Sequence, residues 1–164
     1  MLFELNDVAG VRVVQDFVAV ARSRGERVGL TSGCFDLIHF QHVNFFIRCR
    51  RFCDHLIVGV DADEVVRADK GPSRPMIPDF QRVLMVDALR SVSFAFVMNG
   101  LNDFGRAARL FTPDAIFKND RFKDKEEEIV GREFAQRVII VVDQIYHNST
   151  TEIIRHAQGR HSGD

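Results

Sequence analysis

The feature that most constrains the fold is the run His55-Leu-Ile-Val-Gly-Val-Asp61, which has no polar side chain between its two ends. An unbroken apolar run of this length is typical of a strand that is covered on both faces, as in a parallel sheet. Segments 27–31, 94–97, 115–117 and 138–142 have a similar apolar character. We therefore expect an open parallel sheet of about five strands.

Helical patterns lie between these strands. In segment 11–24, apolar residues recur at spacings of three and four, and Gly25 ends the pattern. A second helix is expected from His42, with Val43, Phe46 and Ile47 on one face. Further helical patterns cover 78–90, 104–111, 125–134 and a last segment that begins at 149. This alternation predicts an α/β class, with helices on both faces of the sheet and ligands beyond the carboxyl ends of the strands.

The length of 164 residues suits a single Rossmann-like domain. We place this domain at 1–158 and expect a frayed tail at 159–164. Twenty-two Lys and Arg against 23 Asp and Glu give a net charge of -1, which argues against nucleic acid or an anionic membrane as partner. The early acidic residues interrupt any signal peptide, and three cysteines form no disulfide framework, so we expect a cytoplasmic protein.

The segment Gly33-Cys-Phe-Asp-Leu-Ile-His-Phe-Gln-His42 joins the first strand to its helix. Free backbone N–H groups and a helix N-terminus attract phosphate at such a junction. His39 in the loop and His42 in the first helical turn are placed to donate hydrogen bonds to one anion. The alternative is structural, with His42 capping the helix and His39 filling space.

Other candidates have structural alternatives as well. Lys70 lies in the polar loop Lys70-Gly-Pro-Ser-Arg-Pro75, from which it can close over an anion, and Ser149 is a helix cap with or without a ligand. Arg74 and Arg82, taken alone, are ordinary surface arginines. Asp36 is expected to support the loop that carries His39, and Cys34 to contribute backbone only.

Together, segment 33–42, the loop at 70–75, Arg82 and Ser149-Thr-Thr151 resemble the cytidylyltransferase-like nucleotidyltransferase superfamily over most of the chain. Within it, the loop is most similar to the adenylyltransferase domain that makes ADP-heptose from a heptose 1-phosphate. This similarity extends to Asp79, Arg82, Ala88, Leu89 and Val92. The glycerol-3-phosphate cytidylyltransferases are next in similarity.

The resemblance implies transfer of a nucleoside monophosphate, AMP favoured over CMP, from ATP or CTP to a phosphorylated sugar or polyol, with release of pyrophosphate. Mg²⁺ carried by the triphosphate is implied, without protein metal ligands or a covalent nucleophile. The implied catalytic residues are His39, His42, Lys70 and Arg82. The implied nucleotide-binding residues are Gly33, Cys34, Phe35, Asp36, Gln41, Ser149, Thr150 and Thr151. The implied acceptor-binding residues are Arg74, Lys118, Asp120 and Arg121.

Three positions depart from the family pattern. Gln41 replaces a glycine, Arg121 takes an acidic position in Lys118-Asn-Asp-Arg-Phe122, and His147-Asn148 replaces a segment that usually includes glycine. One hypothesis is an active enzyme with a shifted substrate, and the other is a nucleotide-binding regulator without turnover. With fifteen phenylalanines in the chain, we also expect Phe45, Phe46 and Phe52 to mark a homodimer surface.

Overall fold

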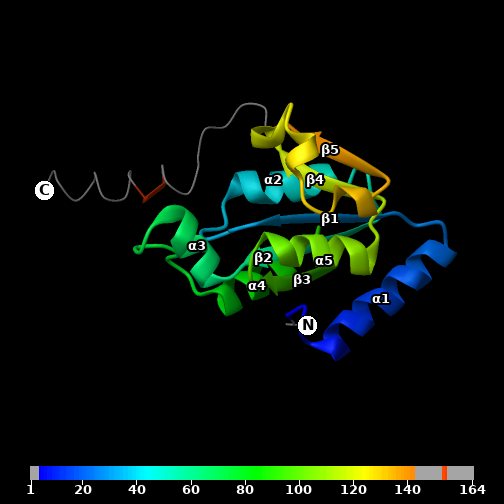
Figure 1. Cartoon of the computed structure of the whole chain (residues 1–164), viewed down its shortest axis with the longest axis horizontal. Helices are drawn as coiled ribbons and strands as arrows, with labels where there is room; N and C mark the ends of the chain where they lie inside the picture. Colours follow the sequence, from blue (N-terminus) through cyan, green and yellow to red (C-terminus); the bar gives the residue numbers. More distant parts are fainter. Residues whose placement is uncertain (1–3, 143–152, 155–164) are drawn as a thin grey trace, which may run out of the picture.

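The structure, a computed structural model, describes residues 4–142 and 153–154 and contains a five-stranded sheet (Figure 1). Its strand order is β3-β2-β1-β4-β5, and every neighbouring pair is parallel. The predicted α/β class with an open parallel sheet is therefore confirmed. The strands are β1 (Val28–Gly33), β2 (His55–Asp61), β3 (Phe94–Met98), β4 (Ala115–Asn119) and β5 (Arg137–Val141).

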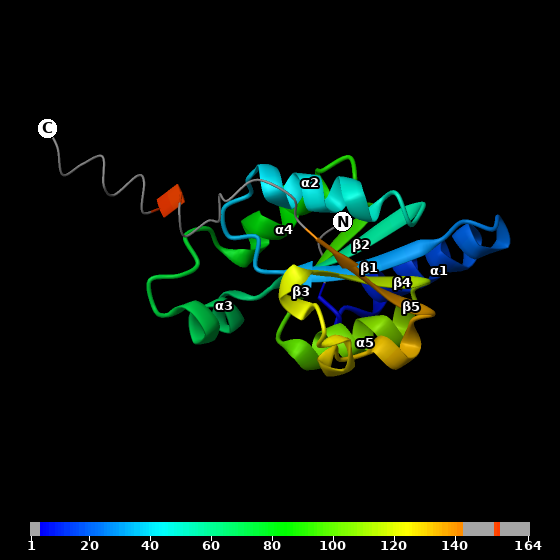
Figure 2. The same cartoon turned by 90° about the horizontal axis from the view of Figure 1, so that it is seen from above.

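Helices cover both faces of the sheet, as expected. One face of the sheet is covered by α1 (Val8–Ser23) and α5 (Leu101–Phe111). The other face is covered by α2 (Phe40–Cys49) and α4 (Asp79–Asp87). Figure 2 shows α2 and α5 on opposite sides of the strands. Along β2, Ile57 belongs to the first core, and Leu56 and Val58 belong to the second. This alternation explains the unbroken apolar run, because each apolar side chain from Leu56 to Val60 enters one core or the other.

Two helices differ from the sequence-based expectation. α3 (Asp63–Lys70) was not predicted, because it is mostly polar and Val66 is its one buried residue. α2 was predicted correctly, and of the face expected to be buried Phe46 is fully buried and Val43 partly buried, but Ile47 is 48% exposed and Cys49 is buried in its place. Cys49 lies three residues after Phe46, on the same side of the helix, and a small thiol fits there against the sheet.

The helix expected over 125–134 is absent. The described chain there forms 3-10 turns instead: η1 (Asp120–Phe122), η2 (Glu126–Glu128) and η3 (Arg132–Phe134). Asp124 and Gly131 have positive φ values of 61° and 83°, which a right-handed helix cannot contain. Asp124 lies directly before the segment and Gly131 lies within it, so these two left-handed residues prevent a continuous helix.

The order of the strands locates the place where ligands of such sheets bind. From the central strand β1 the chain moves outward through β2 and β3, then returns to the other side of β1 with β4 and continues to β5. The carboxyl ends of β1 and β4 therefore flank the switch point, where a crevice opens in folds of this kind.

Some sequence-based expectations fall outside the described part of the chain. They are the last helix from 149, the boundary at 158 and the tail at 159–164. Among the helices that the structure does describe, none has the length and apolar character that a membrane span needs.

Candidate functional site

The loop that leaves β1, residues 33–39, is called the phosphate loop below. Its backbone is shaped by Phe35, which has a positive φ of 47° and is 6% exposed. The Phe35 ring lies over Gly33, where an added Cβ would be 3.0 Å from Phe35 Cζ. The same ring packs against Phe46 and His42, with centroid separations of 5.1 and 5.3 Å. Gly33 thus permits the close approach that anchors the loop to α2.

The two histidines meet at the start of α2. His39 is the N-cap, and its Nδ1 accepts a hydrogen bond from the Gln41 N–H at 3.3 Å. His42 lies in the first turn, and the two ring centroids are 3.9 Å apart. The structural alternative assigned the cap to His42, whereas the structure assigns it to His39. Gln41, which lies between the two histidines in the sequence, is half-buried.

His42 is held neutral in the absence of a ligand. Burial, together with the nearby His39 and Lys70 charges, lowers its pKa to about 4, while a hydrogen bond with the Leu37 backbone acts in the opposite direction. The Nδ1 atom of His42 is buried without a hydrogen-bond partner. Buried polar atoms in native proteins almost always have a partner. This nitrogen is therefore a polar atom beside the phosphate loop whose hydrogen-bonding capacity the described residues leave unused.

Lys70 is the last residue of α3 rather than part of the polar loop. Its side chain is exposed, and its charge acts on both His42 and the Cys34 thiol, with which it also hydrogen-bonds. Burial is the larger influence on Cys34 and raises the pKa of that thiol. The ammonium of Lys70 therefore lies at the rim of the phosphate loop.

Asp36 ties the phosphate loop to the segment before α4. It is 2% exposed, and its Oδ1 accepts hydrogen bonds from the backbone N–H groups of Met76 and Ile77 at 2.7 and 3.1 Å. Its Oδ2 accepts from Arg74 Nε at 2.5 Å. The expected support of the loop is present, but these bonds run to residues 74–77 and not to His39. Arg74 is an ion-pair partner with a buried, unpartnered Nη2, so the surface interpretation of this arginine is wrong.

Arg82 is fully buried, at 0% exposure, so the surface interpretation fails here too. Its Nε donates to the Ile77 carbonyl at 2.8 Å, Nη1 to the Cys34 carbonyl at 2.6 Å, and Nη2 to Asp63 Oδ1 at 2.7 Å. All three nitrogens therefore bond to protein acceptors beneath the phosphate loop.

Lys118 lies near the end of β4, on the side of the switch point opposite to β2. It is 8% exposed, and its Nζ donates to Ser32 Oγ at 2.8 Å while lying 3.9 Å from the centroid of the Phe104 ring. The pKa of Lys118 is about 8, because burial lowers it by more than the opposite charge of Asp61 raises it. This cation joins the ends of β4 and β1 and belongs to the predicted site.

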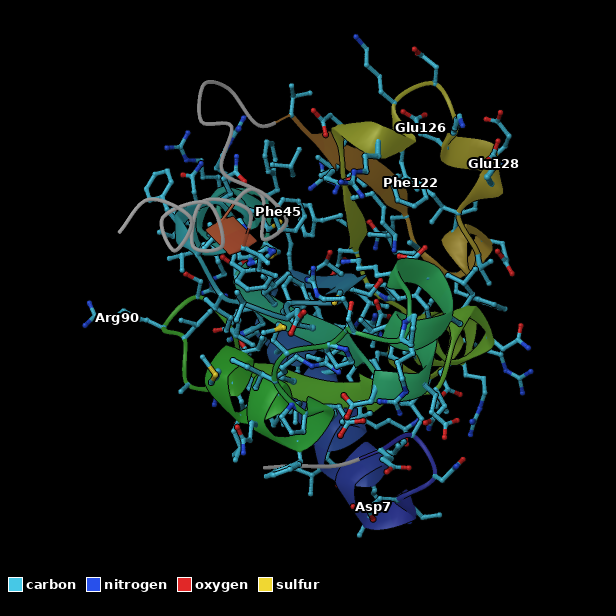
Figure 3. The ribbon with its side chains drawn as sticks, turned by 90° about the vertical axis from the view of Figure 1, so that its left-hand side faces the viewer. Asp7, Phe45, Arg90, Phe122, Glu126 and Glu128 are labelled. Carbon is cyan, nitrogen blue, oxygen red and sulfur yellow. The ribbon has the colours of Figure 1, made fainter. Side chains whose placement is uncertain are left out.

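Asp120 and Arg121 follow Lys118 in η1, and both are exposed. They stand at the carboxyl end of β4, the edge at which an acceptor was expected to bind. Figure 3 looks at the molecule from the side on which α3 lies. It shows Phe122 inward of Glu126 and Glu128, which lie at the periphery.

Three polar residues of this edge were not predicted from the sequence. Ser32 is the second-last residue of β1, Asp61 is the last residue of β2, and Asp63 is the first residue of α3. Burial raises the pKa of Asp61, opposed by the charges of Lys118, Arg82 and Lys70. The signal was available, because the rule that places ligands beyond the carboxyl ends of strands applies to Ser32 and Asp61 directly. The predicted nucleotide-binding residues Ser149, Thr150 and Thr151, and the departures His147 and Asn148, lie outside the described residues.

Sequence comparison connects this arrangement with known proteins. The family model for cytidylyltransferase-like proteins matches residues 30–157. Bifunctional protein HldE of Desulfatibacillum aliphaticivorans is 34% identical over 137 residues, which cover 82% of this chain and 27% of the relative. Bifunctional protein HldE of Bradyrhizobium sp. (strain ORS 278) is 33% identical over 144 residues, 86% of this chain and 29% of the relative. The chain thus spans less than a third of the length of these curated relatives.

Solved structures share the fold. The lipopolysaccharide core biosynthesis protein from Thermoplasma volcanium superposes with a TM-score of 0.61 at 22% identity, covering 74% of this chain and 99% of that one. Pantoate-beta-alanine ligase from Francisella tularensis gives a TM-score of 0.53 at 11% identity, over 88% and 75% of the two chains. At these identities, the likeness concerns the arrangement of strands and helices.

Proposed function

Because the chain belongs to the cytidylyltransferase-like family and is a nucleotidyltransferase, we propose that it transfers AMP from ATP to a phosphorylated sugar such as a heptose 1-phosphate. Attack of the acceptor phosphate on the α-phosphorus would release pyrophosphate. Two observations support this choice of substrates: the curated relatives are named bifunctional protein HldE, and the loop at 70–75 resembles the loop of the ADP-heptose-forming domain.

The proposal is carried by the stacked pair of His39 and His42 at the start of α2. A triphosphate placed there would meet the positive end of the helix dipole and the unpartnered Nδ1 of His42. Nucleotidyl transfer needs little more from a protein than an aligned attack and neutralised charge. The two imidazoles would supply hydrogen bonds to oxygens on which negative charge develops.

The remaining residues divide between the two substrates. Lys70, at the rim of the phosphate loop, would approach the triphosphate, and we propose that Ser149, Thr150 and Thr151 bind it as well. Lys118, Asp120 and Arg121 stand at the end of β4, where the acceptor would bind. The cationic Arg121 in place of a carboxylate favours an anionic acceptor.

Mg²⁺ would accompany the triphosphate. Within residues 4–142 and 153–154, no three His, Cys, Asp or Glu side chains gather into a metal site. Mg²⁺ in nucleotide enzymes commonly has one or two protein carboxylates, with phosphate and water completing its shell. Asp61 is a carboxylate at the carboxyl end of β2, and the charge of Lys118 acts on it. The ion would supply positive charge that offsets the charge of the phosphates.

The test is pyrophosphate release by the purified protein with Mg²⁺. ATP, CTP, GTP and UTP are each combined with heptose 1-phosphate, glycerol 3-phosphate and other sugar phosphates. Release only with ATP and a sugar 1-phosphate is the expected result. CTP with glycerol 3-phosphate as the productive pair would assign the second activity of the family. Triphosphate binding without turnover on any acceptor would contradict the proposal and favour a nucleotide-binding regulator, in which Gln41 obstructs the reactive pose.

The role of the histidines can be tested separately. We expect His39→Ala to reduce turnover on the order of 100-fold or more, because a donor that acts in the transition state is lost. His55→Gln is the matched control, since His55 pairs with Glu26 at the opposite end of β2. Steady-state rates and melting temperatures of both variants are measured. An active His39→Ala protein that melts early would support a purely structural cap.

A further inference from the structure

The amino-terminal ends of α3 and α4 cap each other. The N–H of Asp63, the first residue of α3, donates to Asp79 Oδ2 at 3.1 Å. The N–H of Asp79, the first residue of α4, donates to Asp63 Oδ1 at 2.8 Å. Neither helix has a side-chain hydrogen bond from its own N-cap residue. A carboxylate at a helix N-terminus is favourable, so this exchange holds the two helices start to start.

Arg82 connects this pair of caps to the phosphate loop. Its Nη2 bonds the same Asp63 Oδ1, at 2.7 Å, that caps α4, and its Nη1 bonds the Cys34 carbonyl at 2.6 Å. The guanidinium is planar and rigid, so its acceptors are fixed relative to one another. This buried arginine has a carboxylate to balance its charge and a protein acceptor for each of its three nitrogens.

The orientation of the Cys34 carbonyl determines the direction of a donor. In a trans peptide the C=O and the following N–H point in opposite directions. Since the Cys34 carbonyl points toward Arg82, the N–H of Phe35 points away from Arg82. The left-handed φ of Phe35 fixes the next turn of the backbone. Arg82 thereby orients the backbone of Cys34 and Phe35, two of the residues predicted to bind the nucleotide.

We propose that Asp63, Asp79 and Arg82 form a clamp that positions the phosphate loop relative to α3, the helix that ends at Lys70. In this arrangement Arg82 is a positioning residue and does not touch the triphosphate. The effect of the clamp on turnover rests on the proposed function, whereas its effect on the loop does not.

The clamp can be tested with Asp63→Asn, which keeps the shape of the side chain and removes its charge. Asp87→Asn is the control, because Asp87 accepts a hydrogen bond from the Ala95 N–H at the other end of α4. The first measurement is alkylation of Cys34 by iodoacetamide, located by peptide mapping. Cys34 is half-buried, whereas Cys49 and Cys53 are buried, so the reaction reports on the phosphate loop. Thiols held protonated by burial react slowly.

We expect Asp63→Asn to raise the alkylation rate of Cys34 several-fold and Asp87→Asn to leave that rate unchanged. The two variants should lose similar amounts of melting temperature relative to the wild type. We also expect kcat to fall in Asp63→Asn and in Arg82→Lys, and the double variant to be no worse than Arg82→Lys, because both changes break one clamp. The KM for ATP should change less than kcat. A merely structural Asp63 would lower the melting temperature and leave the alkylation rate and kcat unchanged.

Wild-type alkylation and turnover in Asp63→Asn, with turnover lost only in Arg82→Lys, would overturn the clamp and favour direct phosphate contact by Arg82. Asp79→Asn, which retains the pair of Arg82 and Asp63, decides the question if Asp63→Asn does not fold. In that variant, faster Cys34 alkylation supports the clamp and an unchanged rate overturns it. A wild-type protein without pyrophosphate release would contradict the proposed function alone, since the alkylation measurements would still decide the clamp.

Discussion

At the scale of single residues, the most consequential group is His42, which is neutral and half-buried. Its pKa is about 4 in the folded protein and near 6.5 in an unfolded chain. Between these values the unfolded chain binds a proton that the folded chain does not. Stability is therefore lost as the pH falls from 6.5 toward 4, and the loss stops below pH 4, where both states are protonated.

His42→Gln should abolish this part of the pH dependence. The slope attributable to His42 is at most about 1.4 kcal/mol per pH unit. Urea unfolding of the wild type and the variant at pH about 7 and about 5 gives the change in the free energy of unfolding with pH for each protein, and the difference between the two changes is the contribution of His42. Other titrating groups contribute equally to both proteins, so their contributions cancel in this difference. Equal slopes in the two proteins would contradict a depressed pKa for His42.

The identity of site residues was easier to predict than their partners. His39 and His42 could be placed from their spacing beside Gly33, because the loop between a strand and a helix has few conformations. The burial of Arg82 could not be predicted, since its partners Cys34 and Asp63 lie 48 and 19 residues away in sequence. Such bonds depend on how α3 and α4 dock, and no local pattern encodes that.

At the scale of elements, the segment after β4 shows how glycine geometry decides the local structure. Gly131 has a φ of 83°, and an added Cβ would lie 2.8 Å from Ala108 Cβ and 3.0 Å from Gly105 Cα. The segment therefore comes close to α5 at a point where only glycine fits. Sequence periodicity alone predicted a helix here, because it does not report the sign of φ or contact with another helix. α3 also escaped prediction, because it is mostly polar and the carboxylate that caps its N-terminus, Asp79, comes from another helix.

Gly131→Ala should destabilise the fold strongly, by about 2–4 kcal/mol, through a left-handed φ and a clash with α5. Gly25→Ala is the matched control. Gly25 has a similar φ of 74° with nothing within 4 Å of an added Cβ. It should therefore lose only about 1 kcal/mol. Urea unfolding gives both values, and equal losses would show that the contact with α5 is unimportant.

At the scale of the whole molecule, the exposed apolar side chains bear on self-association. Of the three phenylalanines expected to mark a dimer surface, Phe46 is fully buried at 0% exposure and Phe52 is 40% exposed. On the outer side of α2, Phe40 and Ile47 are exposed at a spacing of seven residues, which places them on one face of the helix. A homodimer through α2 would therefore use Phe40, Ile47 and Phe52 rather than Phe46.

If the chain forms this homodimer, Ile47→Lys should convert it to a monomer, because a charge would enter an apolar contact. Val20→Lys is the control: Val20 has nearly the same exposure, 47% against 48%, but lies on α1 across the sheet. Light scattering of the wild type and both variants checks the prediction. A dimer that survives Ile47→Lys would exclude this face of α2.

The order of the strands also has a consequence for how the protein assembles. The partners Val28 and His55 of β1 and β2 are close in sequence, whereas Lys118 reaches Ser32 across a separation of 86 residues. Closing a longer loop costs more chain entropy, so contacts of low sequence separation tend to form first. During synthesis the half that contains β1, β2 and β3 emerges before β4 exists. We therefore expect the nucleotide side of the crevice to form early and the acceptor side to form only when β4 inserts beside β1. The two halves of the site would then form in the order in which they are synthesised.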